Sequence, residues 1–494
     1  MPERTDSNAN PYLALGVRPF INCCSVRTMH GGSLMLPRVR AAVDAASRQF
    51  VNLDELMEAA GRRLAELTGA EWGIVTCGSA AAVALASAAC VAGNDPVRML
   101  RLPFTDGWVN RVILPKNQRF AYDQAIRMVG ARIIEIDSAA DLEVALREPV
   151  AMVAILGTNE EFSKIRLEEI VARVKPLGIP ILVDAASEHL QRPSPWLMRG
   201  ADMVIYSGGK FLRGPQTSGL LLGKKNLVQA AWRNASPHQA FGRPMKVSKE
   251  DVIGVLAAVE YWLEERDEAA ELQHWYDDLQ EIARRVATVH GTSSDVIEPK
   301  SVVRVPVLRV TWDGIALDGV GLRQRLLDGS PRIMIDDTTA TANSVTIDPF
   351  QFQPGEAAQV GQAIADALTA AHNLQHPTEP PVQADISGNW DVRVHFLHGE
   401  RKHRLKLQQQ GSQLSGSQQS EQFESNVIGR LGARQVHMQF ETRHEGSAIA
   451  YRFEGTVSNG TMQGEVFLGS ATDNHRGPVN LSQFGKGKWE ATRV

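Results

Sequence analysis

The sequence has few cysteines and no long apolar run, and these absences exclude several classes of protein. Its 494 residues include only four cysteines, and no two of them form a CxxC pair. We therefore expect reduced thiols, with neither a disulfide framework nor a metal site. No stretch approaches the roughly 20 apolar residues that a membrane-spanning helix needs. The polar N-terminus also lacks the apolar core of a signal peptide, so the sequence predicts a soluble, cytoplasmic protein.

An excess of positive charge is also missing. The chain has 52 lysines and arginines against 56 aspartates and glutamates, which gives a formal net charge of −4. This balance gives no overall basic footprint for nucleic acid, so we predict no nucleic-acid partner. The length and a hydrophobic content of 43% allow a large core and more than one domain.

The strongest chemical signal in the sequence surrounds Lys210. Residues 205–223 read IYSGGKFLRGPQTSGLLLG, so Lys210 lies in a glycine-rich loop between two apolar runs that predict strands. A lysine held against a buried pocket can lose its proton and attack a carbonyl carbon to form an imine. An ordinary surface lysine in a glycine-rich hairpin explains this stretch equally well on its own.

Asp184 and Ser79 also follow predicted strands. Asp184 ends the β-branched run IPILVD, and Ser79 begins an alanine-rich helix directly after Gly78. An aspartate can keep the pyridine nitrogen of pyridoxal phosphate (PLP) protonated, and a helix N-terminus can bind its phosphate. Each residue has a plainer interpretation as a helix cap. The three signals in this order nevertheless favour a PLP site.

Strands and helices alternate through the first half of the chain. The strands are predicted at 73–76, 111–114, 132–136, 151–156, 180–183, 203–207 and 219–222. Alternation of this kind is typical of a mainly parallel sheet with helices on both faces. Ligands of such sheets bind at the carboxyl ends of the strands, where Ser79, Asp184 and Lys210 are expected.

These motifs together resemble a known family. The segments TCGSAA (76–81), VDAA (183–186) and SGGKFLRGPQ (207–216) are similar to those of fold-type I PLP-dependent enzymes. The similarity is greatest to the selenocysteine synthase-like branch, which includes D-glucosaminate-6-phosphate ammonia-lyase, and it covers roughly residues 15–370. It implies an α/β fold with a large PLP-binding domain and a small α/β domain, assembled as a homodimer or a larger homo-oligomer.

The resemblance also implies roles for individual residues. Lys210 would hold PLP as an imine and act as general base, and Asp184 would pair with the ring nitrogen. The phosphate and ring contacts would come from Gly78, Ser79, Ala80, Ser207 and Gln118. Tyr122 is an alternative to Gln118 beside the ring, and a simple turn serine is the alternative for Ser207. His30 could reach a ligand, although a histidine in a surface loop is the simpler interpretation.

The substrate is harder to predict. Many proteins of this branch read PPIxxR where this chain reads PRIMID (331–336), so Asp336 stands where the family has an arginine for a substrate carboxylate. Either Arg213 or Arg332 takes over that role, or the substrate carries a different group there. We expect a small amine substrate and β-elimination of the ammonia-lyase type. Racemisation and transamination begin with the same steps; selenium transfer on seryl-tRNA and a non-catalytic binding protein are weaker alternatives.

The pattern of the sequence changes near residue 376. We predict an N-terminal arm (1–36), the large domain (37–290), the small domain (291–375), a proline-rich linker (376–385) and a C-terminal domain (386–494). The C-terminal domain has about eight short alternating segments separated by turns, which predict an antiparallel β-barrel. Its opening ISGNWDV resembles lipocalin-like barrels, but only at the level of the fold. The barrel either binds a small ligand or, as we favour, packs against the catalytic part or another subunit.

Overall fold

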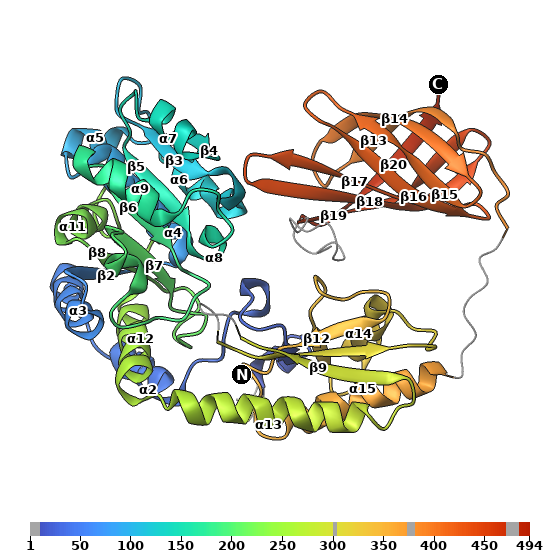
Figure 1. The fold of residues 1–494 in the computed structure, drawn as a ribbon, viewed down its shortest axis with the longest axis horizontal. Helices are drawn as coiled ribbons and strands as arrows, with labels where there is room; N and C mark the ends of the chain where they lie inside the picture. Colours follow the sequence, from blue (N-terminus) through green and yellow to red (C-terminus); the bar gives the residue numbers. More distant parts are fainter. Residues whose placement is uncertain (1–9, 300–303, 373–380, 471–483) are drawn as a thin grey trace, which may run out of the picture.

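The computed structural model describes residues 10–299, 304–372, 381–470 and 484–494. Residues 1–9 of the predicted N-terminal arm and half of the predicted linker (376–380) lie outside these residues. The described chain forms an α/β part followed by a β-barrel, which confirms the predicted fold class (Figure 1).

A seven-stranded sheet forms the centre of the α/β part. Its order is β2-β8-β7-β6-β5-β3-β4, and every neighbouring pair is parallel except those that include β8. The strands are β2 (Trp72–Thr76), β3 (Arg111–Pro115), β4 (Arg132–Ile136), β5 (Met152–Leu156), β6 (Ile181–Asp184), β7 (Met203–Ser207) and β8 (Gly219–Gly223). All seven predicted strands are present, and the sheet is mainly parallel as expected.

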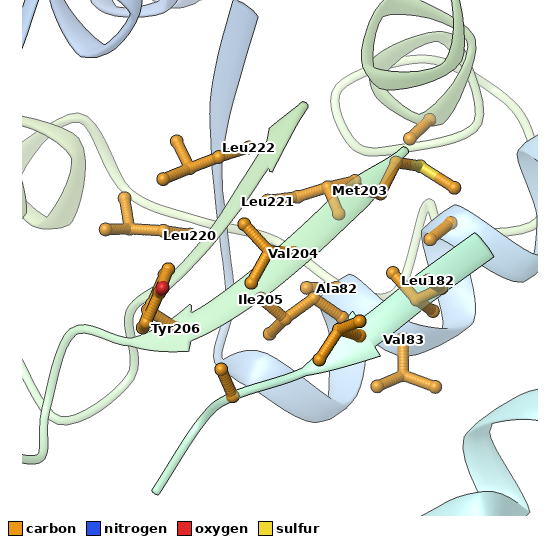
Figure 2. Close-up of a cluster of buried hydrophobic side chains, with 14 of the residues drawn as sticks. Ala82, Val83, Leu182, Met203, Val204, Ile205, Tyr206, Leu220, Leu221 and Leu222 are labelled. Atoms are coloured by element: carbon orange, nitrogen blue, oxygen red, sulfur yellow. The ribbon is translucent and has the colours of Figure 1, made fainter. Parts of the chain in front are cut away.

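The central strands form because they are continuous apolar runs that can be covered on both faces. Val204, Ile205 and Leu221 are fully buried, and Figure 2 shows how side chains of β6, β7 and β8 gather beside helix α4 (Ser79–Ala92). Burying each such side chain stabilises the fold by about 1.5–3 kcal/mol. The small alanines of α4 let the helix approach closely, and a Cβ on Gly219 would lie 2.6 Å from the backbone nitrogen of Ser79. The sheet therefore fixes the start of α4.

Helices cover the sheet and connect it to the small domain. They are α2 (Pro37–Ser47), α3 (Leu53–Thr68), α5 (Pro96–Arg101), α6 (Gln124–Arg127), α7 (Ala139–Ala145), α9 (Leu167–Val174), α11 (Lys225–Arg233), α12 (Lys249–Glu260) and α13 (Glu268–Val286). Helices α12 and α13 are separated after a π-helical turn at Tyr261–Glu265, where Asp267 caps the start of α13. Asp267 accepts a hydrogen bond from the backbone N–H of Ala270.

The small domain contains a three-stranded antiparallel sheet in the order β12-β10-β9. Its elements are β9 (Thr292–Ile297), β10 (Val307–Trp312), α14 (Gly319–Asp328), β11 (Ile333–Ile335), β12 (Ser344–Ile347) and α15 (Glu356–His372). The N-terminal arm contributes one strand, β1 (Ile21–Cys23), which pairs in parallel with β11. Three residues give too short a pattern to predict a strand, and the partner lies about 310 residues away.

The C-terminal part is a closed eight-stranded antiparallel barrel. Its strands are β13 (Gly388–His395), β14 (Glu400–Gln410), β15 (Gln413–Gln419), β16 (Glu424–Gly432), β17 (Gln435–His444), β18 (Ser447–Ser458), β19 (Thr461–Ser470) and β20 (Lys486–Arg493). Inward residues such as Trp390, Phe453 and Trp489 fill the interior. In the β18–β19 turn, Asn459 and Gly460 both have positive φ, as the Ser-Asn-Gly signal predicts. Among the described helices, none is long and apolar enough to cross a membrane.

Candidate active site

A cavity of about 520 Å³ opens at the carboxyl ends of the sheet strands. Its lining joins segments that are far apart in the sequence: Thr28, Cys77, Gly78, Ser79, Ala80, Phe120, Tyr122, Leu156, Thr158, Asp184, Ala186, Ser187, Ser207, Lys210, Gln216 and Thr217. Of the predicted cofactor residues, the structure brings six together here and leaves out Gln118. This is the position at which open α/β sheets bind ligands.

Lys210 lies in a tightly folded loop between β7 and β8. A Cβ on Gly209 would lie 2.3 Å from the Cα of Gln216, so this loop tolerates only glycine at that point. Burial lowers the pKa of the Lys210 ammonium, and the negative charge of Asp184 opposes this effect. Lys210 Nζ donates a hydrogen bond of 2.7 Å to Ser187 Oγ. A lysine with a lowered pKa and a fixed direction is suited to attack a carbonyl carbon.

The N-terminal arm is fastened to the outside of the same loop. The backbone N–H and the hydroxyl of Ser33 each donate a hydrogen bond of 3.1 Å to the carbonyl oxygen of Gly209. The side chain of Gln216 donates to the carbonyl oxygen of Thr28, which brings Thr28 to the cavity. The structure does not place His30 in the lining; its ring packs edge-on to Phe20.

Asp184 ends β6 and is 9% exposed. Burial raises the pKa of its carboxyl group, while the backbone N–H of Ala186, at 2.9 Å, and the charge of Lys210 lower it. A buried carboxylate of this kind is compensated best by a cation placed against it. The protonated pyridine nitrogen of PLP would be such a cation, so Asp184 fits the predicted cofactor.

The N-terminus of α4 fits the phosphate of the same cofactor. The N-cap residue is Gly78, with φ of +95°, and no side chain of the described residues caps the helix. Its first backbone N–H groups are therefore available to an anion, and the hydroxyl of Ser79 lies beside them. Ser207, at the end of β7, also lines the cavity. The cavity therefore contains both a donor group suited to the phosphate of PLP and a carboxylate suited to its ring nitrogen.

The cavity wall expected beside the cofactor ring does not contain Gln118, the residue first predicted there. Gln118 is fully buried, donates to Ser163 Oγ at 2.7 Å and accepts from the backbone N–H of Leu156 at 2.8 Å. Its amide is thus engaged in holding the loop, and its side chain does not line the cavity. Tyr122, the alternative, does line it, together with Phe120, which the sequence did not single out.

Neither predicted substrate arginine lines the cavity. Arg213 has a positive φ of 55° and donates to the carbonyl oxygen of Leu34, whereas Arg332 donates to the carbonyl oxygen of Arg18. Asp336, which replaces the family arginine, binds Arg27 instead at 2.5 Å.

Arg27 directly precedes the cavity residue Thr28, and Asp337 binds it as well, at 2.6 Å. The Arg27 guanidinium thus joins the arm to the small domain, and its charge is already balanced by two carboxylates. No local pattern indicates this pairing, because its partners are more than 300 residues apart in the chain.

Glu188 lies behind the site and gives a testable pH dependence. It is 6% exposed; its Oε2 accepts from Trp196 Nε1 at 2.8 Å, and its Oε1 has no hydrogen-bond partner among the described residues. Burial raises the pKa of this carboxyl group to about 7. A raised pKa means that the folded state loses stability as the pH rises from the unfolded value, near 4.5, through about 7.

We therefore expect Glu188→Gln to stabilise the protein at pH 8 by roughly 1–3 kcal/mol. The two proteins should be equally stable near pH 4, where Glu188 is protonated in both states. Denaturant unfolding at the two pH values measures this difference. An equal change at both pH values would contradict the assigned pKa.

Comparisons with known proteins agree with this geometry. Residues 51–245 match the family model described as Aminotransferase class-V. A 5'-C-glycyluridine monooxygenase-decarboxylase from Streptomyces sp is 31% identical over 383 residues, which cover 74% of this chain and 94% of that protein. An L-seryl-tRNA(Sec) selenium transferase from Moorella thermoacetica is 25% identical over 407 residues, covering 72% of this chain and 83% of that protein.

A third relative is similar in both sequence and structure. The D-glucosaminate-6-phosphate ammonia lyase of Salmonella typhimurium (strain 14028s / SGSC 2262) is 29% identical over 365 residues, covering 71% of this chain and 96% of that protein. A solved D-glucosaminate-6-phosphate ammonia-lyase superposes with a TM-score of 0.66 at 28% identity. This superposition covers all of that enzyme and 74% of this chain. About a quarter of this chain therefore has no counterpart there.

Proposed function

Since the chain belongs to the class-V aminotransferase family of PLP-dependent enzymes, we propose that it eliminates a β-substituent and ammonia from a small amino acid or amino sugar acid. The observation that carries this proposal is the cavity in which Lys210, Asp184 and the uncapped N-terminus of α4 meet. When bound there, PLP supplies an electron sink for the charge that develops at the substrate Cα. The ammonia-lyase relative supports elimination as the outcome.

Each residue then has a defined task. Lys210 Nζ would hold the cofactor through its carbonyl carbon, and as a free amine it would take the proton from the substrate Cα. Ser187 Oγ orients Nζ by accepting its hydrogen bond. Asp184 holds the ring nitrogen protonated, and Gly78, Ser79, Ala80 and the hydroxyl of Ser207 hold the phosphate.

The elimination step balances without an oxidant. The Cα–H bond breaks and its proton goes to Lys210 Nζ, while a double bond forms to Cβ. The C–O bond at Cβ breaks, and the hydroxyl group takes up a proton and leaves as water. The released enamine becomes an imine when a proton moves from its nitrogen to Cβ. One water then hydrolyses this imine to a keto acid and ammonia, so the net reaction converts a hydroxy amino acid into a keto acid and ammonia.

Phe120 and Tyr122 are our candidates for the side chain beside the cofactor ring, since both line the cavity. Substrate carboxylate contacts are less constrained. Arg213 and Arg332 remain predictions for that role.

A second candidate function follows from the monooxygenase-decarboxylase relative, which has the higher identity of the two lyase-type relatives. That reaction would remove the carboxylate at Cα and consume oxygen, rather than remove a group at Cβ. Racemisation and transamination share the initial steps at Cα. Selenium transfer on seryl-tRNA is a weaker candidate; it requires tight tRNA binding at physiological salt, which a filter-binding assay measures.

One screen separates these reactions. Purified protein with added PLP would be incubated with D- and L-hydroxy amino acids and amino sugar acids, with and without phosphate groups. Ammonia together with a keto acid, without oxygen uptake, supports elimination. Carbon dioxide with oxygen uptake favours the second candidate, and no turnover of any amine would favour a non-catalytic binding role.

We also propose a homodimer or a larger homo-oligomer. The cavity lining within one chain contains Lys210 as its only cationic side chain among the described residues. A phosphate and a carboxylate together would carry more negative charge than this lysine balances. Light scattering tests the assembly, and a monomer at micromolar concentration would contradict it.

We place the protein in the cytoplasm because its four cysteines, all in the described chain, are free thiols. Fractionation of the source cells with an antibody to the protein tests this placement. Recovery outside the cytoplasmic fraction would overturn it.

A further inference from the structure

The barrel contacts the catalytic part next to the cavity. Figure 1 shows the β17–β18 hairpin projecting toward β4 and α6, away from the body of the barrel. Its turn consists of Glu445 and Gly446, and Glu445 has a positive φ of 52°. This turn reaches the loop 116–123, which carries Phe120 and Tyr122 into the cavity wall.

An ion-pair cluster joins the two parts. Arg119 is buried and binds three carboxylates, those of Asp123 at 2.5 Å, of Glu135 on β4 and of Glu445 on the hairpin. The first two hold Arg119 within the catalytic part, and the third ties the barrel to it. The hydrogen bond from Arg119 is the main cause that lowers the pKa of Glu445.

Backbone packing makes the contact specific. A Cβ on Gly446 would lie 2.2 Å from the carbonyl oxygen of Phe120, 2.4 Å from Asp123 Oδ2 and 2.6 Å from the backbone nitrogen of Phe120. The hairpin turn therefore lies directly on the backbone of a residue whose side chain lines the cavity. Phe120 also packs edge-on against Tyr122, with ring centroids 5.9 Å apart.

The loop itself has little regular structure to fix it. Its residues form two 3₁₀ turns, Lys116–Gln118 and Ala121–Asp123, rather than a helix or strand. Single turns of this kind satisfy few backbone hydrogen bonds and depend on tertiary contacts for their position. The solved ammonia-lyase is covered in full by 74% of this chain, so about a quarter of this chain has no counterpart there. The barrel region (386–494) is of nearly that length.

We propose that the β17–β18 hairpin acts within the chain as a brace that positions the loop 116–123 and thereby sets how tightly the cavity holds its cofactor. Glu445, Gly446 and Arg119 are positioning residues in this scheme, because they act through Phe120 and Tyr122. The proposal rests on the proposed PLP function for its effect on the cofactor, but not for the contact itself. It gives the barrel a task that needs no ligand in its interior, which is filled by side chains.

Two variants of the full chain remove the contact by independent routes. Glu445→Gln removes the charge that meets Arg119, and Gly446→Ala inserts a methyl group against the Phe120 backbone. Glu421→Gln is the matched control, since Glu421 is an exposed glutamate in the turn between β15 and β16. Amide hydrogen exchange of the apoprotein and cofactor titration at the absorbance band of bound PLP are the two readouts.

In both test variants, the amide hydrogens of peptides covering 116–123 should exchange faster than in wild type. Amide exchange in the barrel strands should be unchanged. We expect the PLP concentration for half-saturation to rise about tenfold, within the range of typical coupling between sites. Glu421→Gln should match wild type in both readouts. Wild-type exchange of the loop in both test variants would overturn the contact, and faster exchange with unchanged PLP saturation would overturn its effect on the cavity. Absence of a PLP band in wild type would instead contradict the proposed function, while the exchange data would still decide whether the barrel braces the loop.

Discussion

Lys210→Ala should abolish the absorbance band of covalently bound PLP and lower turnover by about 10³-fold or more. Both effects follow from one atom, because Lys210 Nζ would bind the cofactor carbonyl carbon and later take the proton from Cα. In wild type we expect a band near about 420 nm that borohydride removes, as for a protonated imine of PLP with an amine. The variant should lack that band after incubation with PLP, and mass spectrometry after borohydride should find the cofactor on the wild-type Lys210 peptide alone.

The matched control for this experiment is Lys164→Ala. Lys164 is a mostly exposed lysine that pairs with Asp137 outside the cavity, so its loss should change neither spectrum nor turnover. The Lys210→Ala protein should still bind PLP without a covalent bond, because the α4 N-terminus and Asp184 remain. Small primary amines added to the variant should restore part of the turnover, as they replace the missing base. Unaltered turnover in Lys210→Ala would exclude the assigned mechanism.

The structure brings together residues that short local patterns in the sequence predict to lie near one another. Lys210, Asp184 and Ser79 each follow an apolar strand, and parallel strands must end at the same edge of the sheet. The motifs give only the order of these residues along the chain. The geometry of the sheet then brings them close together in space. Predicted strand positions agree with the structure for the same reason, since β-branched apolar runs of four to six residues have few alternatives when both faces are covered. The barrel strands follow from alternation and glycine-containing turns such as 458–460.

Contacts between distant segments could not be predicted in this way. Thr28 is held at the cavity by a hydrogen bond from Gln216, and Arg27 forms an ion pair with Asp336. Neither contact produces a periodic pattern in the sequence from which it could be predicted. Gln118 was placed in the wall because of its position after β3, whereas its buried amide is engaged by Ser163 and Leu156. Phe120, only two residues along, lines the cavity instead. The end of a predicted strand thus indicates which loop lies at the cavity. Which side chains of that loop face the cavity depends on tertiary packing, which the local sequence does not determine.

Ser187 is one site residue that the sequence could have revealed. It lies three residues after Asp184, in the segment that follows the same strand, and its hydroxyl meets Lys210. The arginine predictions had no comparable local constraint, because the substrate contact in the family comes from another domain. The domain boundaries at 290 and 375 stay predictions, as does the role of Arg213 or Arg332 toward substrate.

Asp184→Asn should lower turnover by about 10²- to 10³-fold while leaving the apoprotein at least as stable as wild type. The carboxylate is buried, and its raised pKa shows that the charged form is disfavoured in the cavity without a cation. A group with a raised folded pKa stabilises the fold below its unfolded value near 3.8 and loses that contribution as the pH rises through the folded value. At neutral pH the neutral amide avoids this cost, so the variant apoprotein should not melt earlier.

Added PLP should reverse the order of stability. In wild type the cationic ring nitrogen offsets the buried charge of Asp184, so PLP should raise the melting temperature strongly. In Asp184→Asn that pairing is absent, so the same PLP concentration should raise it less, and the ring loses the proton that makes it an electron sink. Thermal unfolding of both proteins with and without PLP measures whether the order of their melting temperatures reverses. A variant apoprotein that is much less stable than wild type, or an equal gain from PLP in both, would show that Asp184 supports the fold and not the cofactor.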